Sequence, residues 1–405
     1  MSNANAILPY GRHCIEDDDV AAVTAVLRGD WLTTGPAVDA FEQRLAERVG
    51  ARHAVACSSG TAALHLAALA AGLEPSQHAI VPSMTFSATA NGARYTGAEI
   101  AFSDVDPDTG LMRAVDLEAA LRERRDTTPA AVFPVHLAGQ VTDMAAIHDV
   151  ARAQGLRIVE DASHAIGARY RAGPDGEWLD VGCCRHSDMT VFSFHPVKSI
   201  AMGEGGAITT NDPALDARLR DLRTHGLTRD AERFEDREAA FDESGTVNPW
   251  YYELQELGFN YRASDIHCAL GHSQLGKLDR FIARRSELVG LYDAAIGRLA
   301  PHLKPLPRIV DCMPAWHLYV VLIDFAAAGI GRGDTMRKLR EFGIQTQVHY
   351  IPVHRQPYYR QRYGTPDLPG TGRYYERTLS LPLFPDMADS DVTRVIEALA
   401  TVLDV

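Results

Sequence analysis

Lys198 stands in a segment whose residue types suit a nucleophilic amine. The segment Ser193–Gly206 places this lysine just after an apolar run, in a short loop that ends in glycines. A lysine can act as a nucleophile when apolar surroundings favour the loss of its proton. Taken alone, a lysine in such a loop is more often an ordinary surface residue, so this interpretation needs support from other parts of the chain.

Asp161 and His164 supply part of that support. Asp161 follows the apolar run Arg157–Glu160, and ligands of open α/β sheets bind at the carboxyl ends of strands. A carboxylate at that position can keep a pyridinium nitrogen protonated, as an electron-sink cofactor requires. The alternative for Asp161 is an N-cap for the following turn. His164 is equally compatible with a hydrogen bond to a ring oxygen and with a structural role.

The segment Cys57–Leu64 has the pattern of a strand, a Ser/Gly turn and the start of a helix. Backbone N–H groups at a helix N-terminus bind phosphate, and a glycine such as Gly60 lets the backbone approach the ligand. A helix capped by a serine or threonine is the alternative interpretation. The segment is not a Walker loop, so the phosphate signal is weak in isolation.

Composition excludes several other classes of protein. The 405 residues carry a formal net charge of −13, with 46% hydrophobic and 23% charged residues, which disfavours nonspecific binding to nucleic acid or anionic membranes. No zinc-ligand spacing and no G-x-S-x-G motif occur in the sequence, so we expect no metal. The six cysteines are scattered and the first residues lack the pattern of a signal peptide, so we expect reduced thiols and a cytoplasmic protein.

Short apolar runs alternate with helical patterns from about residue 50. The expected strands are His53–Cys57, Ala79–Val81, Glu99–Val105, Ala130–Val135, Arg157–Glu160, Met189–Phe194 and Ala207–Thr210. This alternation predicts the α/β class, with a mostly parallel central sheet flanked by helices on both faces.

The pattern changes after about residue 270. We expect one long helix over Ala269–Gly297, followed by the apolar runs Leu318–Ile323 and Thr346–Tyr350 in a smaller α+β domain. The predicted division is a large domain with an N-terminal arm over residues 1–268 and a small C-terminal domain over residues 269–405. Residues 228–252 are polar and predict a surface excursion. The acidic run Glu16–Asp19 predicts a solvated helix start.

The phosphate turn, the carboxylate and the lysine occur in the same order in fold-type-I enzymes that depend on pyridoxal 5′-phosphate (PLP). More narrowly, the chain resembles the DegT/DnrJ/EryC1/StrS sugar aminotransferases from about Ile7 to Leu403. The motifs that carry the family resemblance are Ser59–Ala62, Glu160–Ala165, Ser193–Lys198 and Gly203–Gly206. The likeness to one branch of the family is carried by Pro9–Arg12, Asp30–Pro36, Gly258–Arg262, Trp316–Tyr319 and Gln347–Pro352. One departure is Ala201-Met202, where the family more often has two threonines.

The resemblance implies a role for each matching residue. Lys198 would bind PLP covalently and move the proton at the substrate carbon, while Asp161 would pair with the ring nitrogen. The implied cofactor-binding residues are Gly60, Thr61, Ala62, Phe86, Asp161, His164, Ser193, Lys198 and, from a partner subunit, Asn260. The implied substrate-binding residues are Tyr10, Asp30, Trp31, Leu32, Thr33, Gln347, Val348, His349 and Tyr350.

The resemblance also implies an activity. It is greatest to the branch that aminates C4 of a UDP-linked 4-keto-6-deoxy-N-acetylhexosamine for pseudaminic acid, with L-glutamate as donor, pyridoxamine 5′-phosphate (PMP) as intermediate and a homodimer with shared sites. Other possibilities are a family member acting on a dTDP- or GDP-linked keto-sugar at C3 or C4, and a noncatalytic regulator. The related sugar dehydratases carry histidine at the lysine position, so Lys198 argues against that reaction.

Overall fold

The large central sheet has seven strands in the computed structural model, which describes residues 7–123, 126–299 and 301–404. The expectation about a signal peptide concerns residues that lie outside this described part. The strand order is β1-β9-β8-β5-β4-β2-β3. The strands are β1 (His53–Cys57), β2 (Gln77–Pro82), β3 (Glu99–Ser103), β4 (Thr128–Val132), β5 (Arg157–Asp161), β8 (Met189–Ser193) and β9 (Gly206–Thr210).

The predicted mostly parallel sheet is confirmed, with one exception in direction. β8, β5, β4, β2 and β3 pair in parallel, whereas β9 runs antiparallel to both of its neighbours, β8 and β1. Because β9 follows β8 directly and reverses direction, the chain between them turns back at the carboxyl end of β8. Lys198 lies in that turn.

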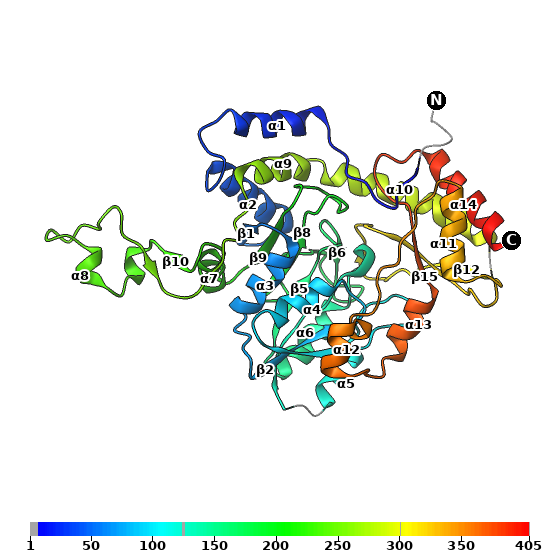
Figure 1. Cartoon of the computed structure of the whole chain (residues 1–405), viewed down its shortest axis with the longest axis horizontal. Helices are drawn as coiled ribbons and strands as arrows, with labels where there is room; N and C mark the ends of the chain where they lie inside the picture. The colour runs from blue at the N-terminus through cyan, green and yellow to red at the C-terminus, as the bar shows by residue number, and fades with distance from the viewer. Residues whose placement is uncertain (1–6, 124–125, 300, 405) are drawn as a thin grey trace.

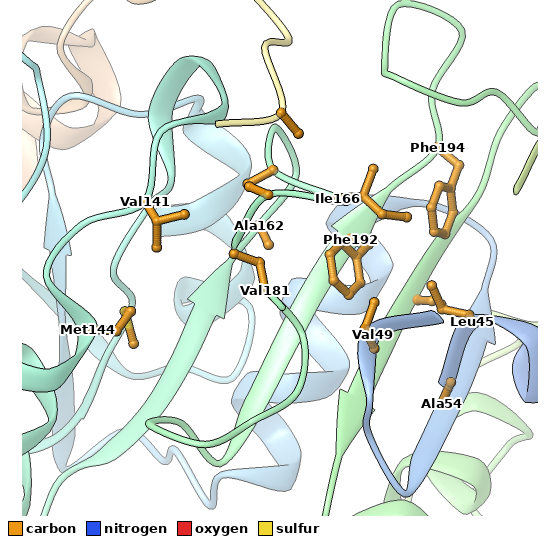
Figure 2. Packing of buried hydrophobic residues seen from close by; sticks show 14 of the residues in the cluster. Leu45, Val49, Ala54, Val141, Met144, Ala162, Ile166, Val181, Phe192 and Phe194 are labelled. Atoms are coloured by element: carbon orange, nitrogen blue, oxygen red, sulfur yellow. The ribbon is translucent and has the colours of Figure 1, made fainter. Parts of the chain in front are cut away.

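Helices cover both faces of the sheet because successive side chains of each strand point to opposite faces. On β8, Val191 packs in the cluster beside α3, α4 and α7, while Phe192 packs in the cluster beside α2, α5 and α6. Figure 2 shows the second cluster, where Phe192 and Phe194 lie near Leu45 and Val49 of α2. The helices of this region are α1 (Asp17–Leu27), α2 (Pro36–Val49), α3 (Gly60–Ala70), α4 (Ser87–Arg94), α5 (Ala114–Arg122), α6 (Met144–Ala153) and α7 (Pro213–Arg223).

A second, three-stranded antiparallel sheet forms in the C-terminal part, in the order β12-β14-β15. It packs with three helices around a separate cluster that includes Tyr292, Val321 and Leu399. The elements here are α10 (Leu278–Ile296), β12 (Leu303–Pro305), β14 (Tyr319–Ile323), α11 (Arg332–Glu341), α12 (Pro357–Tyr363), α13 (Pro369–Arg377), β15 (Thr378–Leu381) and α14 (Asp389–Leu403). The run Thr346–Tyr350 is not a strand, because only Gln347 bridges to β15, at Ser380.

The domain division at residue 268 stays a prediction. That position lies inside α9 (Asp265–Leu275), which packs against α1 and α2. A further small sheet, β13-β6-β7, joins the two parts of the sequence. Its strands are β6 (Arg169–Tyr170), β7 (Leu179–Asp180) and β13 (Cys312–Met313).

The polar excursion over residues 228–252 projects from the rest of the molecule as an arm (Figure 1). Its base is a two-stranded pair of β10 (Leu227–Thr228) and β11 (Glu253–Leu254), and α8 (Arg237–Ala240) lies near its tip. Trp250, near the end of this stretch, has an exposed fraction of 72%.

The expected single helix over Ala269–Gly297 is wrong, since α9 ends at Leu275 and α10 begins at Leu278. Lys277 at the junction has φ −105° and ψ −4°, outside regular helical geometry. Its ammonium group, Nζ, lies 2.5 Å from Asp18 and 2.7 Å from Asp19. The break between α9 and α10 thus coincides with an ionic contact to α1, which the hydrophobic periodicity of the sequence cannot predict.

The expectation that the acidic run is wholly solvated is also wrong, because Asp19 is fully buried. Besides the contact with Lys277, Asp19 accepts hydrogen bonds from Ser273 at 2.6 Å and Gln274 at 2.7 Å. Burial by itself would raise the pKa of Asp19, but these donors lower it below its ordinary value. Asp19 therefore fastens the N-terminal helix to the junction between α9 and α10.

Substituting Lys277 should destabilise the protein strongly. Lys277→Met would leave the Asp19 carboxylate buried without its cation, which costs about 3–5 kcal/mol for comparable buried pairs. Arg280→Gln is the matched control, because Arg280 pairs with Glu16 at 2.7 Å on the surface and exposed pairs contribute less than about 1 kcal/mol. Denaturant unfolding measures both losses, and equal losses would contradict the role given to Asp19.

Two further observations concern the whole described chain. All six cysteines are free thiols. Among the helices of the described residues, none combines the length and the apolar character needed to cross a membrane.

Candidate active site

A cavity of about 570 Å³ lies where loops from the large sheet meet the C-terminal part of the chain. Residues that follow β1, β2, β5 and β8 all line it, so it lies at the edge where strand ends are expected to bind ligands. The sequence-predicted residues among its lining are Tyr10, Gly60, Thr61, Phe86, Asp161, His164, Ser193, Lys198, Gln347, Val348, His349 and Tyr350. Segments more than 300 residues apart in the sequence, Tyr10 and Gln347–Tyr350, therefore share one cavity.

Lys198 is held in a loop closed by backbone hydrogen bonds. The Lys198 N–H donates to the carbonyl of His195 at 2.8 Å, and Met202 N–H donates to the carbonyl of Phe194 at 2.9 Å. Burial lowers the pKa of the Lys198 amine to about 8, and the negative charge of Asp161 opposes part of that shift. A neutral, nucleophilic amine is consequently available much closer to neutral pH than for an exposed lysine.

Asp161 ends β5 and is buried at the cavity wall. Its Oδ1 accepts a hydrogen bond from the Ser163 N–H at 3.1 Å, and its Oδ2 accepts one from the Thr89 hydroxyl at 2.7 Å. In the described chain, the next element after β5 is the strand β6, so Asp161 caps no helix. The bond from the Ser163 N–H does cap the turn after β5, so Asp161 fills the alternative role that the sequence left open and also faces the cavity.

The turn between β1 and α3 brings backbone amides to the cavity. The first helical hydrogen bond of α3 runs from Ala63 N–H to the Ser59 carbonyl, so Gly60 and Thr61 precede it. A Cβ atom at Gly60 would lie 2.7 Å from Cβ of Ser193, which explains the glycine there. The Ala62 N–H donates to the Ser59 hydroxyl at 3.1 Å, so Ser59 caps α3 as in the alternative interpretation. Ala62 does not line the cavity, and its implied role in cofactor binding stays a prediction.

His164 has a defined tautomer. The Ala138 N–H donates to His164 Nδ1 at 3.3 Å, and burial holds the pKa of His164 well below its ordinary value, so the ring is neutral. The proton then resides on Nε2, which lies 2.9 Å from the Tyr350 hydroxyl. His164 therefore donates to Tyr350, and the hydroxyl proton of Tyr350 is available to a group in the cavity.

The other aromatic side chains of the cavity surround that pair. Phe86 lies with its ring centroid 5.7 Å from that of Tyr350, and the Tyr10 ring lies 5.5 Å from that of His349. His349 Nδ1 is 2.8 Å from the Ser380 hydroxyl, and burial together with the charge of Lys198 lowers the His349 pKa to about 3. His349 is hence neutral near pH 7 and offers hydrogen bonds without a charge.

Besides Ala62, two predicted groups do not line this cavity. The stretch from Asp30 to Thr33 is exposed, and its one strand-like contact is the bridge from Thr33 to Ser264. Asn260 is exposed as well, and bridges to Thr224. Their implied roles in substrate and cofactor binding stay predictions.

His317 and Thr89 are among the residues that the sequence reasoning missed. His317 lines the cavity with its ring centroid 4.4 Å from that of His164, and burial holds its pKa well below the ordinary value. The only feature of the sequence that could have identified His317 is its place as a polar residue just before the apolar strand β14, within the Trp316–Tyr319 motif. Thr89 had no signal, because it sits inside α4 and meets Asp161 only through the fold.

The residues of this cavity fit PLP. An amine with a pKa near 8, a buried carboxylate, an exposed aromatic ring and free amides at a helix N-terminus are the groups that its aldehyde, ring nitrogen, ring face and phosphate require. Within the described parts of the chain, no three or more His, Cys, Asp or Glu side chains gather as a metal-ion site.

Known proteins match the chain over its whole length. The model of the DegT/DnrJ/EryC1/StrS aminotransferase family matches residues 13–400. The spore coat polysaccharide biosynthesis protein SpsC of Bacillus subtilis (strain 168) is 40% identical over 406 residues, covering 100% of this chain and 99% of SpsC.

Solved structures agree with these matches. PseC of Helicobacter pylori, an aminotransferase involved in the biosynthesis of pseudaminic acid, superposes with a TM-score of 0.84 at 26% identity, covering 98% of this chain and 99% of PseC. The putative sugar aminotransferase Spr1654 of Streptococcus pneumoniae, in its PLP form, has the same four values. Its PMP form superposes with a TM-score of 0.85.

Removing the charge of Asp161 should change the titration of Lys198. In the cofactor-free protein, Asp161→Asn takes away the anion that favours the ammonium form, so the Lys198 pKa should fall below its value of about 8. The measurement is the pH dependence of Lys198 modification by an amine-reactive probe, read by peptide mass spectrometry. Glu204→Gln, at another carboxylate that lines the cavity, should leave the pKa in place. A rise in the Asp161→Asn protein would refute the assigned coupling.

Proposed function

We propose that this chain, which belongs to the DegT/DnrJ/EryC1/StrS aminotransferase family, transfers an amino group from L-glutamate to C4 of a UDP-linked 4-keto-6-deoxy-N-acetylhexosamine. Members of this family are PLP-dependent enzymes that use a nucleotide keto-sugar and an amino donor. The observation that carries the proposal is the shared cavity of Lys198, Asp161 and the Gly60 turn. The reaction catalysed would be that of UDP-4-amino-4,6-dideoxy-N-acetyl-β-L-altrosamine transaminase, which acts in pseudaminic acid biosynthesis.

Each half of the reaction uses the same residues. PLP, when bound, supplies an electron sink and carries the amino group from donor to acceptor. Lys198 Nζ, in its neutral form, takes up and returns the proton at the substrate carbon, while the Asp161 carboxylate holds the proton at the ring nitrogen. Gly60, Thr61 and Ser193 bind the phosphate. Glutamate leaves as the keto acid, and the C4 ketone of the sugar becomes an amine.

The sugar would be bound by the wall of the cavity that contains Tyr10 and His349. Tyr10 and His349 lie against each other there, and Gln347 and Val348 complete that wall. Tyr350 has a free hydroxyl proton to donate, because His164 already donates to its oxygen. Phe86 and Tyr350 together would cover one face of the bound ring and restrict water.

A homodimer with shared sites is part of the proposal. Among the described residues that line the cavity, Lys198 is the one lysine or arginine, although a nucleotide sugar brings two phosphates. Further donors would come from a second copy, with Asn260 among them. The exposed apolar side chains Trp250, Leu254 and Leu257 in and beside the arm support such an interface. A cytoplasmic location also belongs to this proposal.

A second candidate is amination of a different nucleotide keto-sugar for a surface polysaccharide. The 40% identity to SpsC favours it, since the match to PseC is at 26%. The two candidates share the chemistry of Lys198 and Asp161 and differ only in what the Tyr10 and His349 wall accepts.

Substrate turnover separates the two candidates. UDP-2-acetamido-2,6-dideoxy-β-L-arabino-hex-4-ulose should be aminated at C4 with a higher kcat/KM than dTDP-4-keto-6-deoxyglucose, as measured by product mass and NMR. His349→Ala should raise the KM for the sugar and leave the glutamate half-reaction nearly unchanged, because the donor carries no nucleotide. Equal turnover of both nucleotides, or amination at C3, would favour the second candidate.

Subunit mixing tests the shared site. Lys198→Ala and Asn260→Ala proteins should each be impaired, and after exchange a mixed dimer should contain one site with both natural residues. Since half of the dimers are mixed, about a quarter of all sites should then be active. Verified mixed dimers that show no gain over the Asn260→Ala protein would mean that Asn260 acts within its own chain or not at all.

A further inference from the structure

The Asp161 carboxylate is held at both oxygens by donors from two different elements. Ser163, in the loop after β5, donates its N–H to Oδ1 at 3.1 Å. Thr89, the third residue of α4, donates its hydroxyl to Oδ2 at 2.7 Å, although Thr89 and Asp161 lie 72 residues apart in the sequence. Two bonds at separate oxygens prevent the carboxylate plane from rotating about the bond to Cβ.

The direction of the Thr89 hydrogen bond follows from its single proton. Thr89 Oγ1 also lies 3.2 Å from the Phe86 carbonyl, but a hydrogen bond to a charged carboxylate is shorter and stronger. The Thr85 hydroxyl lies 2.7 Å from the Thr89 oxygen. With the Thr89 proton given to Asp161, Thr85 must be the donor in that contact, and the chain of donors runs from Thr85 through Thr89 to Asp161.

Burial makes these hydroxyls hard to replace. Thr89 is fully buried and Thr85 is 2% exposed, so water has little access to take over a lost hydrogen bond. Polar chains in such surroundings also strengthen their neighbours. Thr85 directly precedes Phe86, and the network therefore ties the loop of the proposed stacking ring to the proposed partner of the ring nitrogen.

We propose that Thr89 is a positioning residue that fixes the Asp161 carboxylate toward the bound cofactor. It acts through Asp161 and does not line the cavity. This inference rests on the proposed function, in which Asp161 pairs with the ring nitrogen. Because Asp161 serves both half-reactions, Thr89 affects cofactor affinity and both rates, and it leaves the KM for each substrate alone.

The test separates the hydroxyl from the shape of the side chain. Thr89→Val keeps the shape and removes the donor, whereas Thr89→Ser keeps the donor and removes a methyl group. The measurements, on full-length protein titrated with PLP, are the PLP dissociation constant from absorbance, the pH titration of the bound chromophore and single-turnover rates with glutamate. We expect about tenfold weaker PLP binding and about tenfold slower turnover for Thr89→Val, with a shifted chromophore titration and Thr89→Ser close to the natural protein.

Three outcomes would overturn the proposal. The first is a Thr89→Val protein whose PLP affinity and turnover rate equal those of the natural protein. The second is a Thr89→Ser protein that loses as much affinity and rate as Thr89→Val. The third is an effect of Thr89→Val on affinity and rate that is just as large when Asp161 is already replaced by Asn. If Thr89→Val does not fold, Thr85→Val removes the next donor and should give a smaller loss in the same direction, and no loss there counts against the chain of donors. A failure of the proposed function shows separately, because the natural protein would then bind PLP without turning over glutamate or the UDP-linked sugar, while PLP affinity and the chromophore titration still compare Thr89→Val with Thr89→Ser.

Discussion

The Lys198 amine and the Asp161 carboxylate face one cavity, and the rest of the site depends on the balance between burial and charge at that amine. Burial favours the neutral amine and the carboxylate favours the ammonium form, and the balance leaves a pKa of about 8. A stronger burial would make the amine a weaker base toward the substrate proton, and a stronger ion pair would keep the amine protonated. Both residues must therefore be held at fixed positions, and the loop and the hydrogen bonds around them do this.

The fold meets that requirement by turning the chain at one edge of the sheet. β8 and β9 form the one antiparallel turn that carries Lys198, while β5 ends beside it with Asp161. The N-terminal segment and the C-terminal part also line the cavity, through Tyr10 and His349. The buried contacts of Asp19 with the junction of α9 and α10 fasten the helix that follows this N-terminal segment, so they support the position of Tyr10.

The sequence predicts the parts of the site that lie next to a strand and misses those that only the fold brings together. Asp161 and Gly60 follow apolar runs, and strand ends meet at one edge, so their shared position was predictable. Thr89 lies within a helix, and its contact with Asp161 depends on how α4 packs on the sheet. His317 and the break at Lys277 likewise depend on partners distant in sequence. The implied roles of Asn260 and of Asp30–Thr33 stay predictions, because neither group lines the cavity.

Identifying the lysine that binds the cofactor tests the central claim most directly. The purified protein, incubated with PLP and then treated with borohydride, should carry a pyridoxyl group that peptide mass spectrometry locates on Lys198. Addition of glutamate before the borohydride should prevent the labelling, because the amino group then passes to the cofactor. A label on another lysine, or labelling that glutamate does not affect, would contradict the account.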